Sequence, residues 1–160
     1  MPIKKINPKK LIISPEVQSY CLKKSKSFPR GCPNYGKKEG CPPQPLIDKI
    51  FDLEKELYLI YTEFNVLDFA NNMKNKHPNW TEKQCYNPRF WQGTARVQHK
   101  KELELFQEKY PQTTIDRCPE AHGINVHILM QREAKIKLEW PPRNLTRIVS
   151  LGGYSQNPEL

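Results

Sequence analysis

Two cysteine-proline pairs close together in the first third of the chain exclude regular secondary structure there. Cys32 and Cys41 are each followed by proline, and they enclose eight residues, two of them glycine. Proline and glycine at this density do not suit the interior of a helix or strand. We therefore expect residues 30 to 43 to form a turn-rich loop, the knuckle. One interpretation is that these turns bring both thiols to one point, where the thiols bind a metal ion or an iron-sulfur cluster. The alternative is that the two cysteines are small buried hydrophobic residues.

Positive charge is concentrated around the knuckle. The formal net charge is +9, and residues 1 to 40 hold ten Lys and Arg against two Glu, whereas the rest of the chain holds sixteen against fifteen. This pattern fits a surface for nucleic acid or an acidic partner. It also fits compensation of a negatively charged thiolate centre, or a solvated lysine-rich arm at residues 1 to 13. Within the knuckle, Arg30, Lys37 and Lys38 are candidates for binding phosphate.

The five cysteines favour thiolate chemistry over disulfides. Their number is odd and no signal segment precedes them, which argues for a reducing compartment. Three of the five precede proline, the arrangement that also ends the bacterial ferredoxin motif. Cys118 is one of these, at the expected end of a short strand, and is the third expected ligand. For a fourth, Cys21 on a short expected helix is favoured over Cys85, which lies in a polar and aromatic segment.

Length and hydrophobic pattern predict a single α/β domain over residues 1 to 160. A 37% hydrophobic content in 160 residues is enough for one core. We expect a mixed sheet of about four strands with packed helices, the knuckle and Cys118 meeting at one edge. The expected strands lie at residues 57–62 and 113–116, at 135–140 paired with 145–151, and, ending the basic arm, at 11–13. The expected helices lie at residues 45–53, 66–76, 88–110 and 126–133, with short ones starting at 15 and 79. For residues 126–133 a strand is the alternative, because of their β-branched content.

The four histidines give no clear site. His122 lies four residues after Cys118, close enough to support a ligand, but a loop or core position is the more common role. His99 stands among Gln98, Lys100 and Lys101, which predicts a solvated helix face.

No segment predicts insertion in a membrane. No run approaches the roughly 18 to 20 apolar residues that cross a bilayer, and no apolar signal segment follows Met1. The sequence therefore predicts a cytoplasmic protein without a membrane partner.

Two motifs resemble those of an uncharacterised family of predicted metal-binding proteins, a domain of unknown function common in archaea and anaerobic bacteria. The first is Cys-Pro-x-Tyr-Gly-Lys from Cys32, followed by Cys-Pro-Pro from Cys41. The second, Cys-Pro-Glu-Ala-His-Gly-Ile-Asn-Val from Cys118, is similar to the family's segment of a cysteine followed by Glu-Ala-x-Gly-Ile-Asp-Val. The resemblance implies that these three cysteines bind a metal or cluster.

The chain departs from this family just before Cys118. Members carry a ferredoxin-like cysteine cluster there, whereas residues 109 to 117 contain no cysteine. A second cluster is therefore not expected. A single centre has to be assembled from distant segments, so we expect it also to stabilise the fold.

The leading functional expectation is one 4Fe-4S cluster held by Cys21, Cys32, Cys41 and Cys118. If only three cysteines bind, an open iron allows sulfur removal or transfer on an anionic substrate, either RNA or a phosphorylated small molecule, with Glu120 as acid or base. Two alternatives stay open. One is a nucleic-acid-binding module stapled by zinc; the other is an electron-transfer protein with an acidic redox partner.

Overall fold

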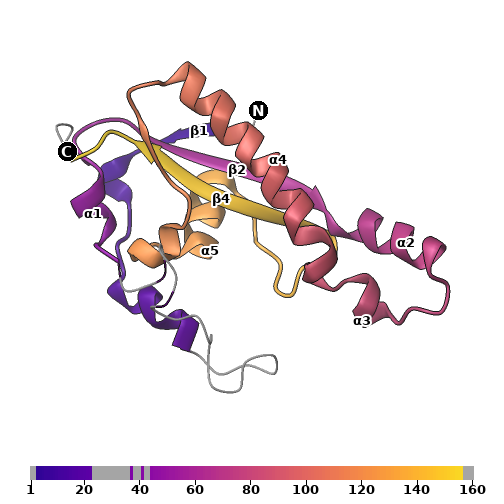
Figure 1. The fold of residues 1–160 in the computed structure, drawn as a ribbon. Coiled ribbons are helices and arrows are strands. Elements are labelled where there is room, and N and C mark those ends of the chain that lie inside the picture. Colours follow the sequence, from indigo (N-terminus) through magenta and orange to yellow (C-terminus); the bar gives the residue numbers. More distant parts are fainter. Residues whose placement is uncertain (1–2, 23–36, 38–40, 42–43, 157–160) are drawn as a thin grey trace.

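A four-stranded sheet crossed by one long helix forms the centre of the molecule (Figure 1). The structure is a computed structural model; it describes residues 3–22, 37, 41 and 44–156, and only the backbone of Cys21. Side by side, the strands are β1 (Ile3–Ile6), β2 (Leu57–Asn65), β4 (Leu145–Gly153) and β3 (Thr114–Asp116). The α/β class, the single domain and the expected number of strands are confirmed.

The described sheet is antiparallel rather than mixed. β2 pairs with β1 and with β4, and β3 pairs with β4, each time antiparallel. β4 comes last in the sequence and is inserted between β2 and β3. Those two strands are therefore parallel to each other without being neighbours, which leaves no parallel ladder.

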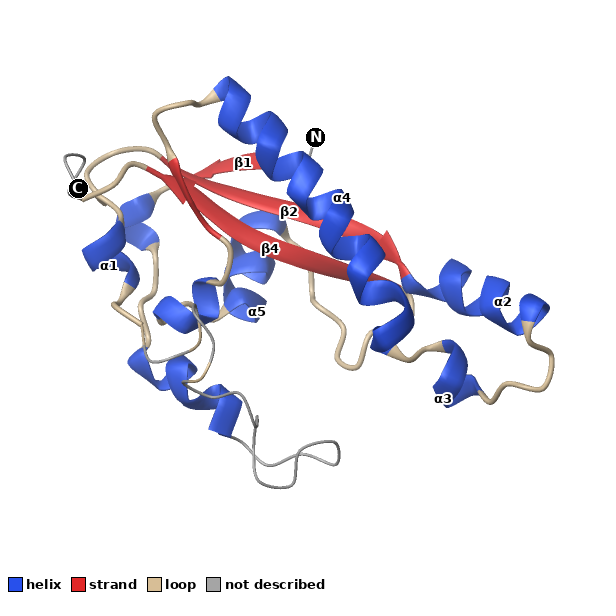
Figure 2. Ribbon diagram, viewed as in Figure 1, coloured by secondary structure: helices blue, strands red, loops and turns tan. Residues whose placement is uncertain are grey.

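Both faces of the sheet are covered, which explains why β2 is apolar on both sides (Figure 2). Alternate residues of a strand point to opposite faces, so Tyr58 and Ile60 pack against Leu103 and Phe106 of α4 (Pro88–Lys109). The opposite face is covered by α1 (Ile47–Ile50) and α5 (Val126–Leu129). Its larger cluster includes Ile47, Phe51, Leu57, Leu59, Ile124, Met130 and Leu151.

The two long helices have the boundaries that the sequence predicts to within one residue. α2 covers Val66–Lys76, and α4 begins at Pro88, where the Asn87 side chain accepts a hydrogen bond from the N–H of Arg89 at 3.1 Å. A third cluster of Val66, Trp91 and Ala95 joins α2 to α4. The short α3 (Glu82–Cys85) begins after Thr81, which forms a capping box with Gln84.

Two expected strands do not form. Residues 11–13 lie outside the sheet, and the N-terminal strand is instead β1, where Ile6 is buried. Residues 135–140 also remain outside it, although β3 pairs with β4 only from Leu151 to Gly153. The Glu139 carboxylate instead accepts hydrogen bonds from three backbone N–H groups, those of Arg143, Asn144 and Leu145.

Two expected helices are shorter or less regular than the sequence indicates. The helix expected at 45–53 is the single turn α1, because Phe51 leaves the helix to form a β-bridge with Ser155. The helix expected at 126–133 is α5 followed by the π-helical turn η4 (Met130–Ala134).

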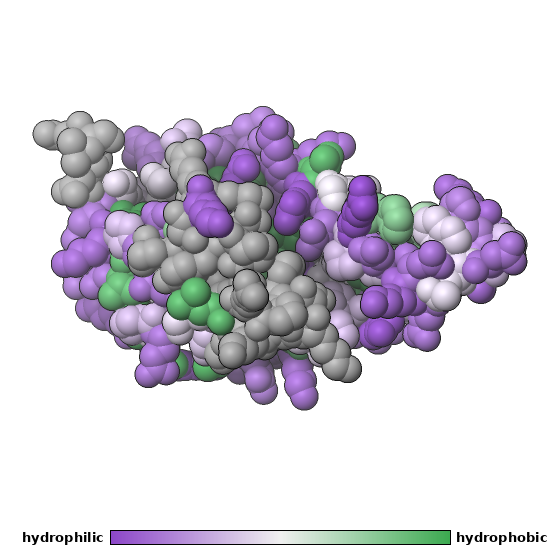
Figure 3. Space-filling model, turned by 60° about the horizontal axis from the view of Figure 1, so that its bottom comes forward, coloured by the Kyte–Doolittle hydropathy of each residue, from purple (hydrophilic) through white to green (hydrophobic). Residues whose placement is uncertain are grey.

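The described surface is mainly hydrophilic in the view of Figure 3, with small separate hydrophobic patches. Among the described helices, none is long and apolar enough to cross a membrane.

Candidate functional site

One glutamine side chain ties together three segments that are distant in the sequence. Gln18 lies on η2 (Pro15–Leu22), the 3-10 helix whose backbone carries Cys21. Its Nε2 donates to the backbone oxygen of Gln44 at 2.6 Å and to that of Ala121 at 2.9 Å. The chain after the knuckle and the chain after Cys118 are therefore held against η2.

A second glutamine extends this connection to Cys41. The Nε2 of Gln44 donates to the backbone oxygen of Cys41 at 2.8 Å. Two amide side chains thus link the segments that carry Cys21, Cys41 and Cys118. Cys41, at the end of the knuckle, therefore belongs to a segment held close to the turn after Cys118.

Gly123 marks the point where these segments pack most closely. It ends η3 (Pro119–His122) with a φ of 85°, in the left-handed region that favours glycine. Its oxygen accepts a hydrogen bond from the N–H of Ser14 at 2.7 Å. A Cβ atom here would lie 2.8 Å from Leu46 Cδ2 and 3.3 Å from the Ser14 oxygen. Only glycine fits this position without a shift of its neighbours.

Cys118 is placed by the turn that follows β3. Its N–H donates to Asp116 Oδ1 at 3.0 Å, and its carbonyl oxygen accepts from the N–H of Ala121 at 3.1 Å. Pro119 then starts η3, as the cysteine-proline pattern suggests. The Cys118 side chain is exposed, and its Sγ lies 3.7 Å from Glu120 Oε2.

The surroundings of Cys118 favour a protonated thiol in the metal-free chain. Desolvation by the surrounding protein, followed by the negative charge of Glu120, raises the Cys118 pKa to about 11. Burial also raises the pKa of Glu120 itself. Binding of a metal would have to displace the thiol proton, and the adjacent Glu120 carboxylate is a ready acceptor for it.

A histidine and an aspartate support the same turn. His122 Nδ1 lies 2.6 Å from the backbone oxygen of Pro45, which can only accept, so Nδ1 carries a proton. His122 Nε2 lies 3.5 Å from Asp116 Oδ1. Burial raises the Asp116 pKa, and the positive charge of His122 opposes this rise. The other oxygen, Asp116 Oδ2, is buried and has no hydrogen-bond partner in the described part of the chain.

The other predicted site residues divide into two groups. Lys37 is described and exposed, whereas Arg30, Cys32, Lys38 and the Cys21 side chain lie outside the described residues. Cys85 is buried on α3, which lies at the end of the molecule away from α1 (Figure 1). Its position makes it a poor partner for Cys41 and Cys118.

The available thiols suit an iron-sulfur or zinc centre, which both prefer sulfur ligands. Cys41 is half-buried and Cys118 is exposed, and neither forms a disulfide. Within residues 3–22, 37, 41 and 44–156, no three His, Cys, Asp or Glu side chains are grouped closely enough to hold a metal ion. The unpartnered Asp116 Oδ2, two residues before Cys118, nevertheless leaves a buried acceptor open at this turn.

Sequence reasoning missed several residues that position this site. No local pattern indicates that Gln18 bridges two segments, because both of its acceptors are backbone atoms far away in the sequence. His99 was expected on a solvated face but is buried, with hydrogen bonds to the hydroxyls of Thr62 and Ser150. Whether His99 is buried depends on which side of α4 faces the sheet. The lysines next to it in the sequence do not reveal that side.

Comparisons with protein-family models, with curated proteins and with solved structures find no match to this chain.

Proposed function

We propose that the chain binds one 4Fe-4S cluster, with Cys41 and Cys118 as ligands together with Cys32 and Cys21. The observation that carries this proposal is the double hydrogen bond of Gln18 to the backbone of Gln44 and Ala121. It links η2, which carries Cys21, to the segment after Cys41 and to the segment after Cys118. Cys32 precedes Cys41 in the knuckle. Such a link has little purpose for separate surface thiols, but it positions ligands that come from distant parts of the chain.

The chain's own groups would prepare and hold the ligands. Cys118 is exposed at a turn fixed by Asp116, so its sulfur can bind without rearrangement of β3. Its thiol proton has an acceptor in Glu120, 3.7 Å away. The knuckle's lysines would offset the negative charge of the thiolates. When bound, a 4Fe-4S cluster supplies one-electron transfer or, at an iron without a cysteine ligand, a Lewis acid.

Two readings of this centre follow from the number of cysteine ligands. With four, it is a redox or structural centre; with three, sulfur removal or transfer on an anionic substrate becomes available, with Glu120 as acid or base. A zinc centre that staples a nucleic-acid-binding module uses the same thiols and is the alternative.

Cysteine variants test the assignment of ligands. We expect Cys118→Ser and Cys41→Ser to lose most of the iron found in the wild-type protein after anaerobic purification. Cys85→Ala is the matched control, because Cys85 is buried on α3 away from the site, and it should keep its iron. Equal loss of iron in all three variants, or no loss in any, would contradict the proposed ligands.

A fourth variant then separates the two readings. Cys21→Ser that retains a cluster favours three cysteine ligands and an open iron. Loss of the cluster in this variant favours a closed four-cysteine centre.

A further inference from the structure

A cavity of about 240 Å³ opens between α4 and the sheet, on the side of α4 near the end of β3. It lies where the ladder of β3 with β4 stops, because the last paired residues are Asp116 and Leu151. Arg117, the next residue, turns toward the cavity. The walls are formed by Arg96, His99, Lys100, Leu103, Arg117 and Ile148.

Three cations surround this cavity without a carboxylate among its walls. Arg96 and Lys100 are four residues apart on α4 and so lie on the same helix face, where like charges repel. Neither they nor Arg117 has an ion-pair partner in the described part of the chain. A concentration of unpaired positive charge around a hollow is the arrangement that attracts an anion.

His99 adds a neutral polar wall rather than a fourth charge. Both ring nitrogens are engaged, Nδ1 with Thr62 Oγ1 at 2.8 Å and Nε2 with Ser150 Oγ at 2.7 Å. Burial, with a further contribution from the positive charge of Arg117, lowers the His99 pKa to about 4. The ring therefore stays neutral at pH 7 and fixes α4, with Arg96 and Lys100, against the sheet.

We propose that the cavity between Arg96, Lys100 and Arg117 binds the phosphate group of a phosphate ester. The two guanidinium groups match phosphate oxygens in a bidentate manner, and the lysine adds a point charge. The cavity is larger than a phosphate group alone, and Leu103 and Ile148 offer an apolar surface for the carbon part of the ester. No cysteine lines it, so this site stands whether or not the chain binds a cluster.

Phosphate esters of this kind are found both as free nucleotides and along a nucleic acid. Calorimetric titration of the full chain at fixed ionic strength with adenosine monophosphate, inorganic phosphate and a short single-stranded RNA distinguishes these sources. Binding of the mononucleotide assigns a small ligand. Binding of the RNA alone, with the same dependence on the cavity residues, assigns the phosphate backbone of a nucleic acid.

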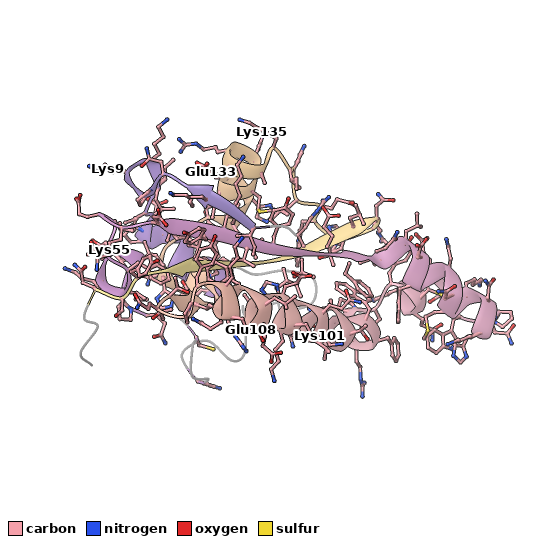
Figure 4. All side chains as sticks on the ribbon, turned by 90° about the horizontal axis from the view of Figure 1, so that it is seen from above. Lys9, Lys55, Lys101, Glu108, Glu133 and Lys135 are labelled. Atoms are coloured by element: carbon pink, nitrogen blue, oxygen red, sulfur yellow. The ribbon has the colours of Figure 1, made fainter. Side chains whose placement is uncertain are left out.

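The variants are chosen to separate this cavity from general positive charge. We expect Arg117→Gln and Lys100→Gln each to weaken binding by about tenfold, the effect of losing one charge-assisted hydrogen bond. Lys101→Gln is the matched control: Lys101 follows on the same helix (Figure 4) but lines a different hollow, together with Glu63 and Glu102. It should change binding by less than about twofold.

These substitutions are at exposed positions, and an unchanged thermal unfolding midpoint would show that the fold is kept. Equal weakening by Lys100→Gln and Lys101→Gln, or no binding of any of the three probes, would overturn the proposal. Repeating the titration with Cys118→Ser keeps the two proposals apart, because loss of the metal centre should leave phosphate binding within about twofold.

Discussion

His99 connects α4 to both central strands through a network that depends on its neutral form. Its two nitrogens meet hydroxyls of β2 and β4, and a neutral imidazole satisfies both by donating to one and accepting from the other. Protonation would place a charge in a buried position beside Arg117. Sequence reasoning placed this histidine among solvated lysines, because the polar residues around it in the sequence are neighbours in the chain rather than in space.

The pH dependence of stability tests this state of His99. Its pKa is about 4 in the folded chain and about 6.5 when unfolded, so between these values the unfolded chain binds a proton that the folded chain does not. Stability should therefore fall as pH decreases from 6.5 to 4, by up to about 3 kcal/mol.

Urea unfolding at several pH values measures this loss of stability. The variant His99→Gln separates the contribution of the histidine from that of the titrating carboxylates. The raised pKa values of Asp116 and Glu120 act in the opposite direction, because burial favours their protonated forms in the folded chain. The difference between wild type and His99→Gln isolates the histidine. A difference that does not change with pH would refute the account of His99.

Two glycine-to-alanine substitutions with opposite expected effects on stability test the packing at Gly123. Gly123→Ala forces an L side chain into a φ of 85° against Leu46 and the Ser14 oxygen, and we expect it to destabilise the fold by about 1–2 kcal/mol. Gly93→Ala, in the interior of α4 with no atom within 4 Å of the new Cβ, should stabilise it by about 0.5–1 kcal/mol. Thermal or urea unfolding measures both; a Gly123→Ala chain as stable as the wild type would contradict the close packing at Gly123.

At the scale of elements, the two long helices could be predicted because their signals are local. Asn87 before Pro88 determines where α4 begins, and α2 ends at Lys76, just before His77-Pro78. Whether a segment forms a strand depends on a pairing partner elsewhere in the chain, which no local pattern reveals. Residues 135–140 alternate like a strand but find no ladder, whereas β1 forms within a lysine-rich segment because Ile6 can be buried.

Gln18 tests whether η2 is held to the turn after Cys118. Gln18→Ala removes two hydrogen bonds and should cost about 1–3 kcal/mol of unfolding free energy. It should also lower the iron retained after purification, because the segments of Cys41 and Cys118 lose their link. Gln92→Ala, an exposed glutamine on α4, is the control and should change neither quantity. Loss of stability without loss of iron would separate the fold from the metal site.

At the scale of the whole molecule, the two proposed sites lie at different places around the sheet. The segments of Cys21, Cys41 and Cys118 meet around η3, and the phosphate cavity lies between α4 and the sheet. Arg117 and Cys118 are consecutive residues, so β3 leads directly from one to the other.

The knuckle's thiols are predicted as ligands from the sequence because cysteine, proline and glycine at that spacing are unusual, and this stays a prediction. The convergence of Cys41 with the Cys118 segment, which the motifs also suggest, depends on Gln18, Gln44 and Gly123, whose roles are set by contacts over long sequence separations. The cation cavity depends on the place where β3 stops and was not predicted.

The most direct test of the central claim is the iron, acid-labile sulfide and zinc content of the full chain purified without oxygen. The proposal predicts about four iron and about four sulfide per chain, with a brown colour that fades on exposure to air. One zinc per chain without iron or sulfide would contradict it and leave the zinc-stapled module as the account of these cysteines.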